Sequence, residues 1–400
     1  MKKFSRAFLI AIFMVPLLFW GKESSAIPVF ARKYKTSCFT CHTQYPARNA
    51  FGEAFKNNGY RWPGGEDEEK TKIEQVKLGT EAWEKLFPDA PYPADISGIA
   101  PFSFWATGNL VSYQEKIDAY KNPVTNANVA ATPEALAWGV PNTARILLGG
   151  TVGDNISYLG VYNFPTTTTA LTTAFQMRAI WSFAPGVTMT FANAFPNITG
   201  VITNVLPAAG TGVEFTYATG DEGGWMVTAG VNNGATTDKL FDKRYIVARY
   251  KLFGAGLLSG AGGVLGNEYI GLDNSVSIGA GIYNSNEGFT TAGDKTQWGV
   301  DLTGNYGNFT AGVAYGQNKD LDSKIFYANL GYYIYPWMLA RVQYDTESVR
   351  DYGRIRPSVR AYLRANVYLD VTYTAFTKDA NASTGVKNRE QAIVSAGIAF

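Results

Sequence analysis

Three residues that could do redox chemistry stand together near the start of the chain. Cys38 and Cys41 are separated by two residues, and His42 follows directly, which gives the pattern Cys-x-x-Cys-His. Two thiols at this spacing can add to the two vinyl groups on one edge of a porphyrin, and the adjacent imidazole can then bind the iron. The chain holds two Cys and one His, all of them in this motif. We therefore expect one covalently bound haem c, with Cys38 and Cys41 as the thioether residues and His42 as the proximal iron ligand.

Other uses of paired cysteines fit the motif less well. A zinc site takes about four nitrogen, sulfur or oxygen ligands, usually from two clusters, and the sequence has one cluster. A plain disulfide leaves His42 without a role, and a thioredoxin-type redox pair is expected beside a βαβ pattern, which does not surround the motif. Haem attachment is the interpretation that uses all three residues.

Residues 1–26 have the features of a secretory signal peptide. Basic side chains at the start are followed by an apolar run at 7–20 and by a small-residue cleavage site that ends at Ala26. The apolar run has about 14 residues, whereas a membrane-spanning helix needs about 20. We therefore expect cleavage after Ala26 and export, which suits the motif because c-type haem is attached outside the cytoplasm.

Charge and hydropathy limit the partners of the chain. It carries 35 basic and 33 acidic side chains. Four of the basic and one of the acidic side chains lie in the signal peptide, so the mature chain has a net charge of −1. That charge argues against a nucleic-acid partner. No long apolar run follows the signal, so a passage through a membrane would have to use strands.

Residues 27–96 are expected to form a small α-helical cytochrome c module with a linker that contains prolines. Phe51 and Phe55 are four residues apart, so they share one helix face and could pack on the porphyrin, although ordinary core packing explains them equally well. A second, charged helix is expected at 66–86. The module has no second His and no Met, so a sixth iron ligand would have to come from another part of the chain.

Residues 97–400 have the two-residue period of β-strands. The run 175–183 alternates apolar with mostly polar side chains, and similar runs recur up to the last residue. Tight turns alternate with long polar loops, as in an outer-membrane β-barrel that contacts lipid. A soluble β-sandwich, solenoid or propeller fits less well, because the sequence has no repeat. Aromatic residues near strand ends are expected to form girdles at the membrane interface: Tyr332, Tyr333, Tyr335 and Trp337.

The length of this region sets the size of the barrel. About 304 residues at roughly 19 per strand and connection give about 16 strands, or 18 if residues 254–274 form a further hairpin. A barrel of this size encloses an aqueous channel unless something fills it, and the module could lie inside as a plug. Basic residues with lumen parity, Arg178 and Arg341, would most simply line a wet wall.

Strand parity places Met226 on the lumen side. Trp225 and its alternate neighbours are apolar and face outward, so Met226 faces inward together with Thr228 and Asn232. An inward thioether could be the distal haem ligand, although packing alone accounts for one such residue.

In its motifs and in the order of its parts, the chain resembles the fused monohaem cytochrome–porins of bacterial outer membranes, a family that includes iron(II) oxidases. The likeness lies in the lead-in 30–34, the Cys-x-x-Cys-His motif, the Ala-Phe-Gly to Asn-Gly-Tyr segment at 50–60, and the order of a haem module before a β region. The resemblance implies an outer-membrane protein that takes electrons from extracellular Fe(II) through a single haem and passes them to a periplasmic electron carrier.

Two alternatives stay open at this stage. The same conduit could serve other donors or deliver electrons outward. The chain could also be a solute porin in which the haem module is a structural plug, for which a polar lumen is needed. Catalytic side chains of hydrolytic or nucleotide enzymes are not expected, because the only His lies in the motif and no phosphate-binding glycine loop stands between a strand and a helix.

Overall fold

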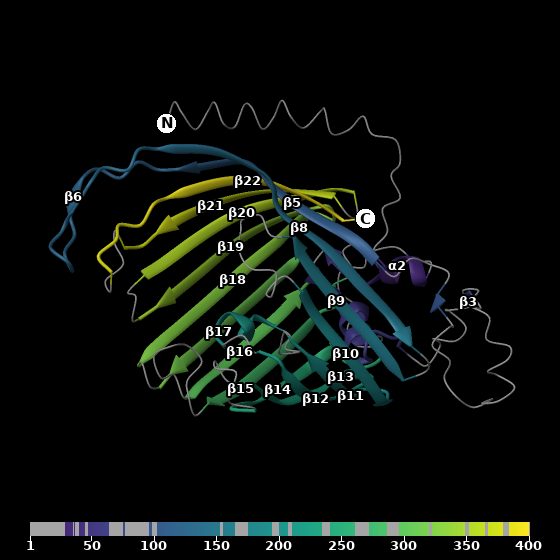
Figure 1. Ribbon diagram of the computed structural model, residues 1–400. Coiled ribbons are helices and arrows are strands. Elements are labelled where there is room, and N and C mark those ends of the chain that lie inside the picture. The colour runs from purple at the N-terminus through teal and green to yellow at the C-terminus, as the bar shows by residue number, and fades with distance from the viewer. Residues whose placement is uncertain are drawn as a thin grey trace, which may run out of the picture.

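The fold is a closed antiparallel β-barrel of 16 strands, preceded by an N-terminal segment (Figure 1). The computed structural model describes residues 29–34, 36, 40–44, 47–63, 75–76, 96–97, 102–152, 155–164, 175–193, 200–206, 210–233, 241–260, 272–285, 296–319, 322–348, 352–364, 367–378 and 384–399. The signal peptide expected at 1–26 and the thiol of Cys38 lie outside the described residues.

The barrel strands follow one another around the cylinder in chain order. They are β5 (Phe102–Gln114), β8 (Ala135–Val152), β9 (Ile156–Phe164), β10 (Phe175–Ala184), β11 (Val187–Ala192), β12 (Gly212–Thr219), β13 (Glu222–Asn232), β14 (Lys243–Ala255), β15 (Ser275–Ser285), β16 (Thr296–Tyr306), β17 (Phe309–Asn318), β18 (Ser323–Tyr335), β19 (Met338–Glu347), β20 (Tyr352–Arg364), β21 (Val367–Phe376) and β22 (Gln391–Ala399).

Closure and strand number follow from the pairing register. β22 pairs with β5, with Ala399 opposite Trp105, so the last strand of the chain joins the first strand of the barrel. β14 pairs directly with β15, with Lys243 opposite Ser285. Residues 254–274 therefore add no further pair of strands to the described barrel wall. The expectation of 16 strands is confirmed, and the alternative of 18 is wrong.

The two ends of the barrel differ in the length of their connections. At one end, which we call the short-turn end, two-residue turns at 185–186 and 307–308 join neighbouring strands, with Gly at a positive φ in each. At the opposite, long-loop end, connections such as 115–134 are much longer, and this one holds the small hairpin of β6 (Tyr120–Lys121) and β7 (Asn128–Val129). The described ends of the connection between β14 and β15, 256–260 and 272–274, lie at the short-turn end instead.

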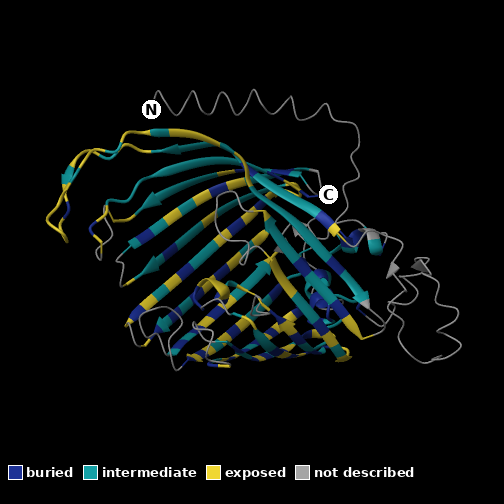
Figure 2. Ribbon diagram, in the orientation of Figure 1, coloured by how far each residue is buried: buried dark blue, intermediate teal, exposed yellow. Residues whose placement is uncertain are grey.

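Alternate residues of each strand lie on opposite faces of the wall, which Figure 2 shows as alternating bands along the strands. On β13, Trp225 is 51% exposed on the outer face and Met226 is 1% exposed on the inner face. Large exposed apolar side chains recur on the outer face of the strands, which is the arrangement of a barrel surrounded by lipid. None of the helices in the described part of the chain is long and apolar enough to cross a bilayer.

The aromatic residues expected at the membrane interface divide between the two faces. Tyr332, Tyr335 and Trp337 are exposed on the outside near the short-turn end, and the rings of Tyr335 and Trp337 stack with centroids 5.3 Å apart. Tyr333 is 4% exposed. The expectation for Tyr333 is wrong, because consecutive strand residues point to opposite faces and Tyr332 already faces outward.

Among its described residues, the N-terminal segment contains two short helices and two pairs of short strands. Its described elements are α2 (Val29–Lys33), β1 (His42–Gln44), β2 (Ala47–Arg48), α3 (Ala50–Asn57), β3 (Gln75–Val76) and β4 (Ile96–Ser97). Within the helix expected at 66–86, only 75–76 is described. These two residues pair with β4 as a strand, so the helix prediction is wrong there. The barrel itself begins at Phe102.

Candidate functional site

The part of the Cys-x-x-Cys-His motif that the structure describes is fixed to the start of α3 by Asn49. The Asn49 backbone N–H donates to the carbonyl of Cys41, and its side-chain amide donates to the carbonyl of Thr40, both at 3.0 Å. Its side-chain oxygen accepts from the N–H of Gly52 at 2.8 Å, which caps the helix. One residue therefore holds the Thr40–Cys41 backbone against a helix N-terminus. We did not single out Asn49 from the sequence, although Asn directly before a helical run is an N-cap signal.

Gly52 lets α3 approach the motif closely. A Cβ atom at this position would overlap the carbonyl oxygen of Cys41 and would also press on Arg48. A glycine is thus required for the contact between the helix and the motif backbone, whatever side chains surround it.

Aromatic side chains surround α3 and form the interior of the segment. Phe55 is buried, and its ring contacts those of Phe30, Tyr34 and Tyr60 at centroid distances of 5.3, 5.5 and 6.0 Å. Phe51 packs edge-on against Trp62 at 4.8 Å. Both phenylalanines expected to pack near the porphyrin therefore belong to one aromatic cluster next to the motif. Cys41 and His42 supply a thiol and an imidazole, and α3 places large flat apolar side chains beside their backbone. These residues fit haem c.

The segment lies against the inner wall of the barrel at the short-turn end (Figure 1). Lys33 Nζ donates to Thr151 Oγ1 on β8 at 2.7 Å, and the hydroxyl of Ser157 on β9 donates to the carbonyl of Gly59. The side-chain amides of Asn57 and Asn58 donate to the carbonyls of Leu257 and Leu258 at 2.7 and 2.8 Å. Helix α3 is thereby fixed to the loop that follows β14.

Met226 lies on the inner wall, as parity predicts. It is packed against Ala218 and Leu257. Because Asn57 binds the Leu257 carbonyl, Met226 lies beneath the loop that holds α3. Thr228 and Asn232 are buried on the same face. The lumen position of Met226 is confirmed, and its role as an iron ligand stays a prediction.

Lys56 is a buried cation on α3. It is 5% exposed, and burial, strengthened by the nearby positive charges of Arg48 and Arg178, lowers its pKa to about 7; Glu53 and Glu214 act in the opposite direction. Lys56 therefore exchanges its proton close to neutral pH in the folded protein, about three pH units below an exposed lysine.

This environment predicts a pH dependence of the N-terminal segment. Because the pKa of Lys56 is lowered in the folded state, the unfolded segment binds more protons between about pH 7 and 10, so the folded segment gains stability as the pH rises through that window. We expect hydrogen-exchange protection of the α3 amides, corrected for intrinsic rates, to rise by up to about tenfold per pH unit. Lys56→Met should remove most of this rise. An equal rise in wild type and variant would show that Lys56 is not its source.

The chain is similar to several solved porin structures. A mutant of the Rh. blastica porin has a TM-score of 0.49 and 10% sequence identity to this chain, with 75% of this chain and 99% of the porin covered. An anion-selective porin from Comamonas acidovorans has a TM-score of 0.46 and 12% identity, with coverages of 75% and 98%. No family model matches the chain, and neither does any curated protein.

A second segment folds into the lumen, between β11 and β12. Its 3-10 helix η4 (Val201–Asn204) lies beside β16 and β17 in Figure 1. Ile202, Val205 and Leu206 are buried against inner-face tyrosines of β14, β15 and β18. Asp301 accepts from the Ile202 N–H at 2.9 Å and pairs with Arg249 at 2.5 Å. This inward segment covers one side of the lumen.

The inner faces of β19 and β20 carry charges that water can reach. Arg354, Arg356 and Arg360 have 35%, 29% and 23% of their side chains exposed. Arg249 and Asp301, on the side covered by η4, are 5% and 0% exposed. Open space in the lumen therefore borders the arginine-bearing wall. The sequence placed Arg341 on this face and Arg178 on the inner face of β10, and the register confirms both.

Proposed function

We propose that this chain is an outer-membrane cytochrome–porin, which carries one haem c on Cys38 and Cys41 with His42 as the proximal iron ligand. It would move electrons between an extracellular donor and a periplasmic electron carrier. The observation that carries the proposal is the attachment of the segment bearing Cys41 and His42 to the inner wall of the barrel, through Thr151 and Leu257. A haem bound there supplies a one-electron centre inside a cylinder whose outer face suits lipid.

The side chains around the motif have separate tasks in this proposal. His42 would bind the iron, and Asn49 keeps the preceding Thr40–Cys41 backbone against α3. Phe51 and Phe55 exclude water, which together with the axial ligand adjusts the reduction potential. Met226, on the wall behind the Leu257 loop, is the candidate for a distal ligand. If it binds the iron, the wild type should show a Met–iron charge-transfer band, and Met226→Ala should lose that band.

The position of the segment favours contact with a periplasmic partner. In outer-membrane barrels the short turns face the periplasm and the long loops face outward. Because the segment lies at the short-turn end, a periplasmic carrier can approach it without entering the barrel. The extracellular donor has to use the lumen from the long-loop end. Fe(II) is the donor implied by the resemblance, which would make the protein an iron(II) oxidase.

Rapid mixing with Fe(II) tests this function. The purified ferric protein should take on the ferrous haem spectrum after mixing with Fe(II), and the midpoint potential should lie above that of the iron couple used. Full reduction by dithionite together with no reduction by Fe(II) would contradict iron as donor. The two remaining roles would then be electron transfer from other donors and outward delivery of electrons. Electron exchange with a periplasmic cytochrome would test them.

A second function is favoured by the exposed charges of the lumen. Side chains such as Arg354 and Arg356 border open space, which a solute channel requires. In a solute porin the N-terminal segment would be a structural haem plug. Vesicles that contain the protein would then admit small solutes at porin-like rates, and no haem reduction would accompany the flux. Electron transfer without measurable solute entry would exclude this role.

A further inference from the structure

One wall of the lumen carries an excess of arginine. Among the described side chains, the inner faces of β8 and β19–β21 hold five arginines and three carboxylates. The arginines are Arg145, Arg341, Arg354, Arg356 and Arg360, and the carboxylates are Asp345, Glu347 and Asp370. Arginine keeps its charge at any physiological pH, so this wall stays positive under all growth conditions.

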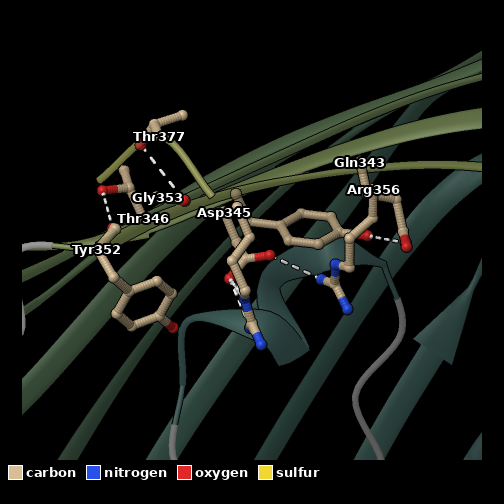
Figure 3. Close-up of polar contacts among 9 residues, drawn as sticks. Gln343, Asp345, Thr346, Tyr352, Gly353, Arg356 and Thr377 are labelled. Carbon is tan, nitrogen blue, oxygen red and sulfur yellow. Dashed lines mark hydrogen bonds and ion pairs between the residues drawn. The ribbon is translucent and has the colours of Figure 1, made fainter. Parts of the chain in front are cut away.

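The carboxylates engage only part of the guanidinium groups. Asp345 Oδ2 accepts from Arg354 at 2.6 Å, and Asp345 Oδ1 accepts from Arg356 at 2.7 Å (Figure 3). Arg360 pairs with Asp370 at 2.8 Å. Within the described part of the chain, the buried Nε atoms of Arg341 and Arg356 have no hydrogen-bond partner.

Those two arginines stand close together. Arg341 is opposite Ser358, and Arg356 is opposite Gln343, so Arg341 and Arg356 are diagonal neighbours across β19 and β20. Such positions have Cα atoms about 7–8 Å apart. Arg341 also lies within electrostatic range of Arg360. The guanidinium groups thus repel one another. The Arg356 and Arg360 side chains keep 29% and 23% of their surface exposed, so an anion in the lumen can reach them and relieve that repulsion.

An oxyanion matches this arrangement. The two Nη atoms at the end of one guanidinium form a planar fork that can donate two parallel hydrogen bonds to a carboxylate or phosphate group. A molecule with two such groups can engage Arg341 and Arg356 at once. The same guanidinium groups repel a hydrated divalent cation, and a lumen with low-dielectric walls strengthens that repulsion.

We propose that the Arg341–Arg356 pair, with Arg360 beside it, is a binding site for small oxyanions that bear carboxylate or phosphate groups. The site draws such anions in from the long-loop end and rejects hydrated divalent cations. Its consequence for iron rests on the proposed function: the donor that reaches the Cys41–His42 segment through the lumen is an anionic Fe(II) chelate.

Calorimetric titration of the detergent-purified full chain tests the site, with citrate and inorganic phosphate as the probes. Wild type should bind both, more weakly at high salt. Arg341→Gln/Arg356→Gln should bind citrate about 100-fold more weakly, about tenfold for each lost fork. In this variant Asp345 keeps its pair with Arg354. Lys116→Gln, which removes an exposed loop cation, is the control and should bind as wild type does.

Three outcomes separate the site from the proposed function. No binding by wild type, or equal binding by the double variant, overturns the site even if Fe(II) reduces the haem. Normal citrate binding together with no haem reduction by any form of Fe(II) keeps the site and overturns iron oxidation. If both hold, Fe(II)–citrate should reduce the haem faster than hydrated Fe(II), and the double variant should abolish that advantage while the Lys116→Gln control keeps it.

Discussion

Replacing Cys38 and Cys41 with serine should leave the barrel folded and abolish covalent haem. The hydroxyl of serine cannot form the thioether bonds, whereas the barrel is closed by the pairing of its own 16 strands. The measurement is haem staining of a denaturing gel, in which haem that is not covalently bound is lost. Staining should fall to background in the double variant, and His42→Ala should also lower it because the iron loses its proximal ligand.

A matched control keeps the thiols and changes their neighbour. Thr40→Ser alters a residue inside the motif and retains the hydroxyl that contacts Thr36 at 2.5 Å, so its staining should equal that of wild type. Persistent staining of the Cys38→Ser/Cys41→Ser protein would mean that the motif does not carry the haem.

Arg249→Met should destabilise the barrel by about 3–5 kcal/mol, because it leaves the fully buried Asp301 carboxylate without its counter-charge. The same carboxylate accepts from the Ile202 N–H, so the inward segment with η4 should also loosen. Urea unfolding of the protein in lipid vesicles measures the change in the free energy of unfolding. Protease cleavage near residue 200 should become faster.

An exposed ion pair is the control for this prediction. Lys116 and Asp118 lie 2.8 Å apart on a surface loop, where water screens their attraction, so Lys116→Met should have little effect. A loss of less than about 1 kcal/mol in Arg249→Met would show that water reaches Asp301 and that the inward segment is not held by this pair.

The two-residue period located the strands from β10 onward and missed three before it. β8 contains Pro141 and the continuous apolar run Ile146-Leu147-Leu148, so its two faces do not differ in polarity. In β9, apolar side chains occur on both faces as well. The strand number was nevertheless right, because it came from the length of the region. Tyr333 was wrongly expected on the outer face, because the neighbouring aromatic residues were all assigned to one face of the strand.

The motif was visible in the sequence, but its surroundings were not. Asn57 and Asn58 bind carbonyls about 200 residues away along the chain, and only the closed barrel brings these parts together. The Arg356–Asp345 pair likewise depends on the register of β19 and β20. Parity identified Met226 and Arg341 as inward residues, since the period of a strand is a local property. Partners across strands require the register, which no local pattern supplies.

The absorption spectrum of the full-length protein, purified from outer membranes after expression with haem maturation, tests the central claim most directly. A protein with one haem c on the segment inside the barrel should be coloured, show a ferrous c-type spectrum after dithionite, and contain one haem per chain. A colourless protein from the same preparation, or recovery of the chain as a soluble periplasmic species, would contradict the account.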